Sequence, residues 1–145
     1  MLLFGAGTAG AQNKDVKNKS ILIASDEAFL KRNASKPGIM VTSSGLQYKV
    51  VKKGTGAKPR KFDKVQINFT LNTLEGKIVG GNGNNIWNHR MDKMTYGMAE
   101  AVRLMPVGSK WILYMPPGLC NSKIGSVGDG RVLVCSIELV AITKE

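Results

Sequence analysis

Alternation of apolar and polar residues is the clearest pattern in this chain. Val65, Ile67 and Phe69 alternate with polar residues, which is typical of a strand with one buried face. The same alternation runs through residues 111–115 and, over a longer stretch, through residues 133–141. Most of the chain is therefore predicted to form strands, largely antiparallel, that share one apolar face.

Two segments are predicted to be helices instead. Ser25 is a good N-cap, and the two acidic residues after it suit the first turn, so a short helix is expected to begin there and to stop before Pro37. Tyr96–Met105 has one apolar helical face, and Pro106 ends it. An antiparallel sheet with one helix on its apolar face is an α+β fold. The Gly/Asn-rich residues 80–85 are expected to be a mobile loop.

The first residues fit two incompatible patterns. Gly5, Gly7 and Gly10 match the GxGxxG fingerprint of dinucleotide-binding proteins, but the polar residues that follow have no apolar face to pack on a sheet. The same stretch also resembles the end of a secretory signal, because short apolar residues precede an A-x-A cleavage site. We expect export to the periplasm on this ground, and a cytoplasmic protein if the stretch is no signal. The expected division is a signal remnant (1–11), a polar linker (12–24) and a folded domain (25–145).

Positive charge is concentrated in one part of the chain. The net charge of the 145 residues is +11, and residues 31–64 hold ten Lys and Arg against Asp63 alone, a balance of +9. Such a run is often only a solvated surface, but it also favours an anionic partner. We expect an acidic protein or a membrane surface rather than nucleic acid, because aromatic residues for base stacking are sparse here. The predicted interaction face comprises Lys49, Lys52, Lys53, Lys58, Arg60, Lys61 and Lys64.

The remaining reactive residues exclude several classes of function. Cys120, Cys135 and the single histidine, His89, lack the spacing of a metal site. No combination of residues indicates a Ser/His/Asp or Cys/His catalytic centre. No apolar run is long enough to span a bilayer. We expect no metal, no cofactor and no transmembrane segment.

Several stretches, in a consistent order, are similar to bacterial FKBP-type peptidyl-prolyl isomerases, above all to their macrophage-infectivity-potentiator branch. The matching segments are SGLQYKV (44–50), KGTGAKP (53–59), LMPVGSKW (104–111), YMPP (114–117) and the closing VLV (132–134) and IEL (137–139). The similarity covers residues 25–143. It implies a curved antiparallel sheet wrapped around one short helix, with a concavity that binds a proline side chain. Such a fold would be preceded here by the short N-terminal helix.

Catalysis in that family needs no nucleophile. Amide resonance sets a barrier of about 18–20 kcal/mol to rotation about the bond before proline. A dry cavity lined by aromatic rings disfavours the planar amide, and a few oriented donors stabilise the twisted one. The lining of the cavity therefore decides the activity, and no single residue is assigned as catalytic.

The resemblance places nine residues at the lining positions, and most differ from the family's. Phe69 keeps a ring without its hydroxyl, and Met98 stands where the family has a tryptophan. Val79 and Gly80 replace a Phe-Asp pair, and Asn121 replaces a tyrosine. Met98 and Cys135 are equally compatible with ordinary core residues. The nine positions are Phe69, Val79, Gly80, Trp87, Met94, Thr95, Met98, Asn121 and Cys135.

These replacements lead us to expect a family member with weak or absent isomerase activity that acts by binding other proteins. An active isomerase with an altered pocket is the alternative, and an adaptor for polyanions or membrane surfaces through residues 31–64 is a second. The resemblance also puts Cys120 and Cys135 beside the same pocket. In an exported protein they are either a disulfide or two buried thiols.

Overall fold

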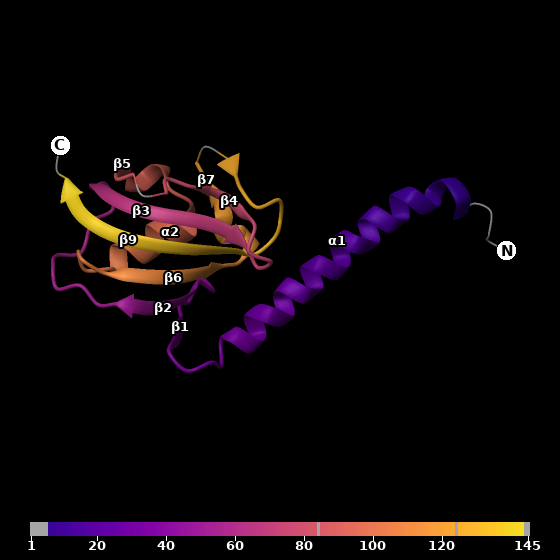
Figure 1. Cartoon of the computed structure of the whole chain (residues 1–145), viewed down its shortest axis with the longest axis horizontal. Helices are drawn as coiled ribbons and strands as arrows, with labels where there is room; N and C mark the ends of the chain where they lie inside the picture. The colour runs from indigo at the N-terminus through magenta and orange to yellow at the C-terminus, as the bar shows by residue number, and fades with distance from the viewer. Residues whose placement is uncertain (1–5, 84, 124, 144–145) are drawn as a thin grey trace.

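A computed structural model of the chain describes residues 6–83, 85–123 and 125–143. A curved antiparallel sheet holds a short helix, α2, against one face, and a long helix, α1, extends away from the sheet as a rod (Figure 1). The helices are α1 (Ala6–Asn33), α2 (Tyr96–Leu104) and the short 3-10 turns η1 (Met91–Lys93) and η2 (Pro117–Cys120). The strands are β1 (Ile39–Val41), β2 (Gln47–Lys52), β3 (Lys64–Thr73), β4 (Ile78–Gly81), β5 (Trp87–Arg90), β6 (Lys110–Met115), β7 (Asn121–Ser122), β8 (Gly125–Ser126) and β9 (Leu133–Thr143).

The main sheet has the order β1-β2-β6-β9-β3-β4, and β5 also pairs with β3. All these pairings are antiparallel. The last strand, β9, lies between β6 and β3, so the C-terminal strand is a central strand of the sheet. Strands β7 and β8 form a separate small hairpin. The predicted α+β fold with a curved antiparallel sheet is confirmed.

The alternating residues form the core, as predicted. Val65 and Ile67 of β3 are fully buried, and the same alternation buries every second residue of β9 from Leu133 to Leu139. Within the described residues, five methionines are buried as well, and this makes the core rich in sulfur. Methionine adapts its shape to irregular gaps, so such a core can fill space that rigid aromatic rings would leave open.

Helix α2 begins and packs as its sequence predicts. The Thr95 hydroxyl accepts a hydrogen bond from the Met98 amide at 3.3 Å and so caps the first turn. The helix ends at Leu104, one residue before the predicted end. A β-carbon on Gly97 would lie 2.7 Å from the Met115 sulfur, so glycine allows α2 to lie close to β6.

Helix α1 differs from the prediction in length. It begins at Ala6 rather than at Ser25, so Ser25 is not its N-cap, and the backbone of the expected polar linker, residues 12–24, is helical. A capping residue favours a helix start without forcing one, and the chain has no proline before Pro37 that would stop the helix upstream. The division at residues 11 and 24 stays a prediction.

The glycine fingerprint has no matching structure among the described residues. Gly7 and Gly10 lie within α1, not in a turn between a strand and a helix, and Gly5 lies outside the described residues. The dinucleotide interpretation is therefore not supported. No helix in the described ranges is long and apolar enough to cross a membrane.

Candidate functional site

Five of the nine predicted lining residues gather where α2 meets the sheet. Met94, Met98 and Cys135 belong to one buried cluster, with 6%, 3% and 0% of their surface exposed, and Phe69 packs against it. The Thr95 hydroxyl lies 3.9 Å from the sulfur of Met115, another member of that cluster. The side chains at these family positions thus belong to one buried cluster or lie against it.

The other four predicted lining positions lie on β4, β5 and β7. Val79 on β4 is 44% exposed, and Asn121 on β7 is exposed. Gly80 lies opposite Leu71 of β3, and Leu71 in turn lies opposite Cys135 of β9. In β5, the backbone of Trp87 pairs with Ile67. The structure therefore does not bring Val79 and Asn121 into the buried cluster.

Asn82 is a structural residue that the sequence analysis missed. It is 5% exposed and its side chain fastens the Gly/Asn-rich segment to β3. Its Oδ1 accepts a hydrogen bond from the Phe69 amide at 2.8 Å, and its Nδ2 donates to the Ile67 carbonyl at 2.9 Å. A composition typical of a mobile loop concealed this anchor, since nothing in the sequence distinguishes Asn82 from its neighbours Asn84 and Asn85.

Both cysteines are buried, free thiols, the second of the two alternatives that the sequence left open. Burial raises the pKa of the Cys120 thiol to about 11 and also raises that of Cys135, with a further contribution from the neighbouring Cys120. The thiol of Cys120 points at the carbonyl oxygens of Pro116 and Met115, at 3.6 and 3.7 Å. Protonated, buried thiols are poor nucleophiles.

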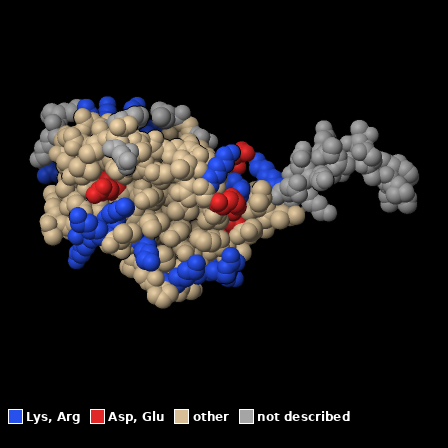
Figure 2. Space-filling model, viewed as in Figure 1, with Lys and Arg blue, Asp and Glu red and all other residues tan. Residues whose placement is uncertain are grey.

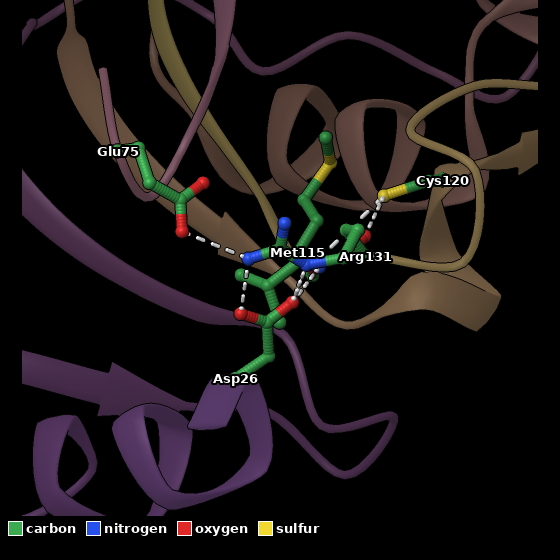
Figure 3. A network of polar contacts seen from close by, with 6 residues as sticks. Asp26, Glu75, Met115, Cys120 and Arg131 are labelled. Carbon is green, nitrogen blue, oxygen red and sulfur yellow. Dashed lines mark hydrogen bonds and ion pairs between the residues drawn. The ribbon is translucent and has the colours of Figure 1, made fainter. Parts of the chain in front are cut away.

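A charged network ties α1 to the sheet beside this cluster (Figure 3). The Arg131 guanidinium donates to both carboxylate oxygens of Asp26, at 2.7 and 2.8 Å, and to Glu75 at 3.0 Å. The Val132 amide also donates to Asp26 at 3.0 Å. The hydrogen bonds to Asp26 and Glu75 and the negative charges of these two carboxylates raise the pKa of Arg131. The carbonyl of Arg131 faces the Cys120 thiol at 4.0 Å, so the network reaches η2.

One cavity lies on the outer side of α2, away from most of the predicted lining. It has a volume of about 740 Å³, within the range of sites that bind small ligands or peptide segments. Its walls come from the loop before β3, from η1, from the exposed side of α2 and from Lys123. Of the nine predicted residues, only Met94 lines it. We call this cavity the α2 groove.

The predicted basic face is divided in the structure. Lys49, Lys52 and Lys53 lie in or directly after β2, whereas Arg60 and Lys61 line the α2 groove. All of the predicted basic residues are exposed except Lys64, which is half-buried in β3. On the side of the molecule in Figure 2, Lys and Arg form separate groups with uncharged surface between them.

Comparison with known proteins indicates the family to which this chain is related. A profile described as FKBP-type peptidyl-prolyl cis-trans isomerase matches residues 55–140, and one described as a domain amino terminal to FKBP-type peptidyl-prolyl isomerase matches residues 5–50. The outer membrane protein MIP of Legionella longbeachae is 36% identical over 126 residues, which are 83% of this chain and 54% of that protein. FkpA of Aeromonas hydrophila is 39% identical over 127 residues, 81% of this chain and 46% of that protein.

The solved structures agree with this fold. FkpA from Escherichia coli superposes with a TM-score of 0.80 at 26% identity, over 94% of this chain and 66% of that one. A peptidyl-prolyl isomerase from Pseudomonas syringae gives a TM-score of 0.75 at 24% identity, over 86% of this chain and 96% of that one. The chain spans about half the length of the curated relatives it matches. By sequence and by fold, the chain belongs to the FKBP-type peptidyl-prolyl cis-trans isomerase family.

Proposed function

We propose that this domain is a weakly catalytic or non-catalytic member of its family that acts by binding other proteins. The observation that carries the proposal is the closed packing at Met98 and Cys135, which are 3% and 0% exposed. A proline ring needs an open, flat-floored cavity at these family positions. A flexible methionine and a small thiol supply neither a floor nor an aromatic wall.

The lining positions also supply fewer polar groups that could stabilise a twisted amide. Stabilising a twisted amide requires donors aimed at it from the cavity wall. Phe69 carries no hydroxyl, and Gly80 carries no side chain at all. Asn121 is exposed on β7 and is not part of the buried cluster. These replacements support a pocket that no longer orients a substrate amide.

Isomerisation of a proline peptide, followed by a coupled protease or by line-shape analysis, tests the proposal. The expected rate is below about one hundredth of that of an ordinary family member, which corresponds to a loss of about 2.7 kcal/mol of transition-state stabilisation. Macrolide inhibitors that occupy the family's pocket should not bind measurably. A rate within about tenfold of an ordinary member would overturn the proposal in favour of an active isomerase with an altered pocket, the activity that the names of the relatives suggest.

We also infer export to the cell envelope. The inference rests on the signal-like first residues and on the name of one relative, an outer membrane protein. Fractionation of the natural host with an antibody against the domain tests it, and recovery of the protein in the cytoplasmic fraction alone would refute it.

A further inference from the structure

We propose that the α2 groove binds acidic peptide segments that carry apolar side chains. This inference rests on the proposed function, since it names the kind of protein segment that the domain would bind. It places the binding site outside the family's proline pocket, on the opposite side of α2. Three properties of the groove support it: an apolar floor, a cationic rim and acidic residues that already have partners.

The floor of the groove is apolar and continuous with the core. Pro59, Met91 and Met94 are buried residues that line it. Tyr96 and Leu104, which stand at opposite ends of α2, are 49% and 38% exposed there. Exposed apolar side chains around a hollow lose contact with water when an apolar group enters it, and this favours binding.

The rim is mainly cationic. Arg60, Lys61, Arg103 and Lys123 line the groove, against Asp92 and Glu100. All four cationic residues are exposed. Within the described residues, none of the four forms an ion pair with a carboxylate. Lys61 instead places its ammonium over the Phe62 ring, 5.4 Å from the ring centre.

The two acidic residues of the groove are already engaged. Arg90 donates to both carboxylate oxygens of Asp92, at 3.1 and 3.0 Å. Glu100 accepts a hydrogen bond from the hydroxyl of Ser44. Neither carboxylate forms an ion pair with any of the four cations in the described part of the chain. The cations are thus left to attract a ligand of opposite charge.

A peptide fits this arrangement better than a membrane or a polyphosphate. A bilayer is bound through apolar side chains that project from a convex surface, whereas here the apolar residues lie at the bottom of a hollow. A polyphosphate has no apolar groups that could occupy the apolar floor. Alternating carboxylates and apolar side chains match both the rim and the floor.

Fluorescence anisotropy with a short labelled peptide of alternating Glu and Leu tests the proposal on the full chain. We expect saturable binding that weakens with salt, and much weaker binding when Gln replaces Glu or Ser replaces Leu in the peptide. The double variant Arg60→Glu/Arg103→Glu should bind about tenfold more weakly or worse, because two attractive charges become repulsive. Amide chemical shifts on titration should change mainly at residues 60–61, 96–104 and 123.

The matched control is Lys49→Glu/Lys52→Glu, which makes the same change of charge in the basic run but outside the groove. It should retain most of the binding. Both variants alter exposed side chains only, so their thermal midpoints should match that of the wild type.

Three outcomes would overturn the proposal: equal binding by the groove variant and the wild type, equal losses in groove variant and control, or tighter groove-dependent binding of phosphatidylserine vesicles or polyphosphate than of the peptide. Isomerase activity measured on the same samples separates this inference from the proposed function. A high rate would refute the proposed function and leave the groove result standing, while failed peptide binding with a low rate would refute only the groove.

Discussion

Arg131 and Asp26 lie 105 residues apart in the chain and form a bidentate ion pair in which the Asp26 side chain is only 4% exposed. The pair joins the long N-terminal helix to the segment that leads into the central strand β9. Because Arg131 also offers its carbonyl to the Cys120 thiol, the same residue connects α1 with η2, next to the sulfur-rich core. The attachment of α1 is therefore part of the domain's own structure.

Removing the charge of this pair should weaken the fold. Asp26→Asn removes the negative charge that pairs with Arg131, while the guanidinium stays largely out of water. We therefore expect a loss of about 1–3 kcal/mol in the free energy of unfolding. Denaturant titration measures it. Asp129→Asn is the matched control, since that side chain is 94% exposed, its ion pair with Lys19 spans 3.8 Å, and asparagine tolerates its positive φ of 50°. Equal stability of the two variants would show that the pair contributes nothing.

This pair should also make the stability depend on pH: the free energy of unfolding should fall as the pH is lowered. Burial alone would raise the pKa of the Asp26 carboxyl, but hydrogen bonds from Arg131 and Val132 and the guanidinium charge hold it below its usual range. A hydrogen bond from Arg131 likewise lowers the pKa of Glu75. A carboxyl whose pKa is lower in the folded state stabilises the fold above its unfolded pKa of about 4, and this stabilisation is lost as the pH falls through the lowered pKa.

The difference between wild type and Asp26→Asn isolates that effect. Unfolding free energies measured from neutral pH downward should converge as Asp26 becomes protonated below about pH 4. A difference that stays constant down to the acid unfolding transition would contradict the assigned direction of the pKa shift.

Gly54 should tolerate no side chain. A β-carbon there would meet the Val107 carbonyl oxygen, the Ser109 amide nitrogen at 2.5 Å and the carbonyl carbon of Gly108 at 2.7 Å. All three are backbone atoms, so a side chain cannot be accommodated by a change of rotamer. Gly54→Ala should cost about 1–3 kcal/mol or more. Gly118→Ala, which meets no atom within 4 Å, should leave the thermal midpoint unchanged or slightly raised.

The thiols should react only after unfolding. Since burial raises the pKa of Cys120 to about 11 and that of Cys135 further, little thiolate is present at pH 8. Iodoacetamide should modify neither residue in the native protein and both in guanidinium chloride, as followed by mass spectrometry. Rapid labelling of the native protein would contradict their burial. Failure to label the unfolded, unreduced protein would reveal a disulfide.

Restoring the family's lining offers a converse test of the proposed function. In the triple variant Val79→Phe/Gly80→Asp/Met98→Trp, a β-carbon at position 80 would lie 3.4 Å from Leu71 Cδ1, an acceptable contact, and Gly80 does not have a positive φ. Some isomerase activity or inhibitor binding should return. A folded but inactive triple variant would mean that features other than these three side chains limit the site.

Local patterns were sufficient to predict much of the fold. The alternation through Val65 and Ile67 places their side chains on the buried side of β3, since successive side chains of a strand face opposite ways. The start of α2 at Tyr96 was predicted from its apolar helical face, and in the structure the Thr95 hydroxyl caps it. The start of α1 was missed because Ser25 satisfies the rules for a cap without being at the end of a helix.

Contacts between distant residues could not be predicted in the same way. Asp26 was interpreted as part of a first helical turn. In the structure its carboxylate accepts hydrogen bonds from Arg131, which lies near the other end of the chain. Asn82 resembles its loop neighbours in sequence, and only the position of β3 makes its amide an anchor. The α2 groove is formed by four segments, and none of them alone indicates a cavity.

Because α1 is attached to the domain near its C-terminal end, a small displacement there would move its N-terminal end much farther. Its closely packed contacts with the rest of the molecule run from Asp26, through Phe29 against Tyr114, to Asn33 bonded to Gln47, and the exposed ion pair of Lys19 with Asp129, at 3.8 Å, adds little to them. This anchored part is about 10 Å long, and the part from Ala6 to Ser25 about 30 Å, at 1.5 Å per residue. A displacement at Asp26 relative to Asn33 would thus be multiplied about fourfold at the far end of the rod. Small adjustments around Arg131 would therefore become several-fold larger displacements of the first turns of α1.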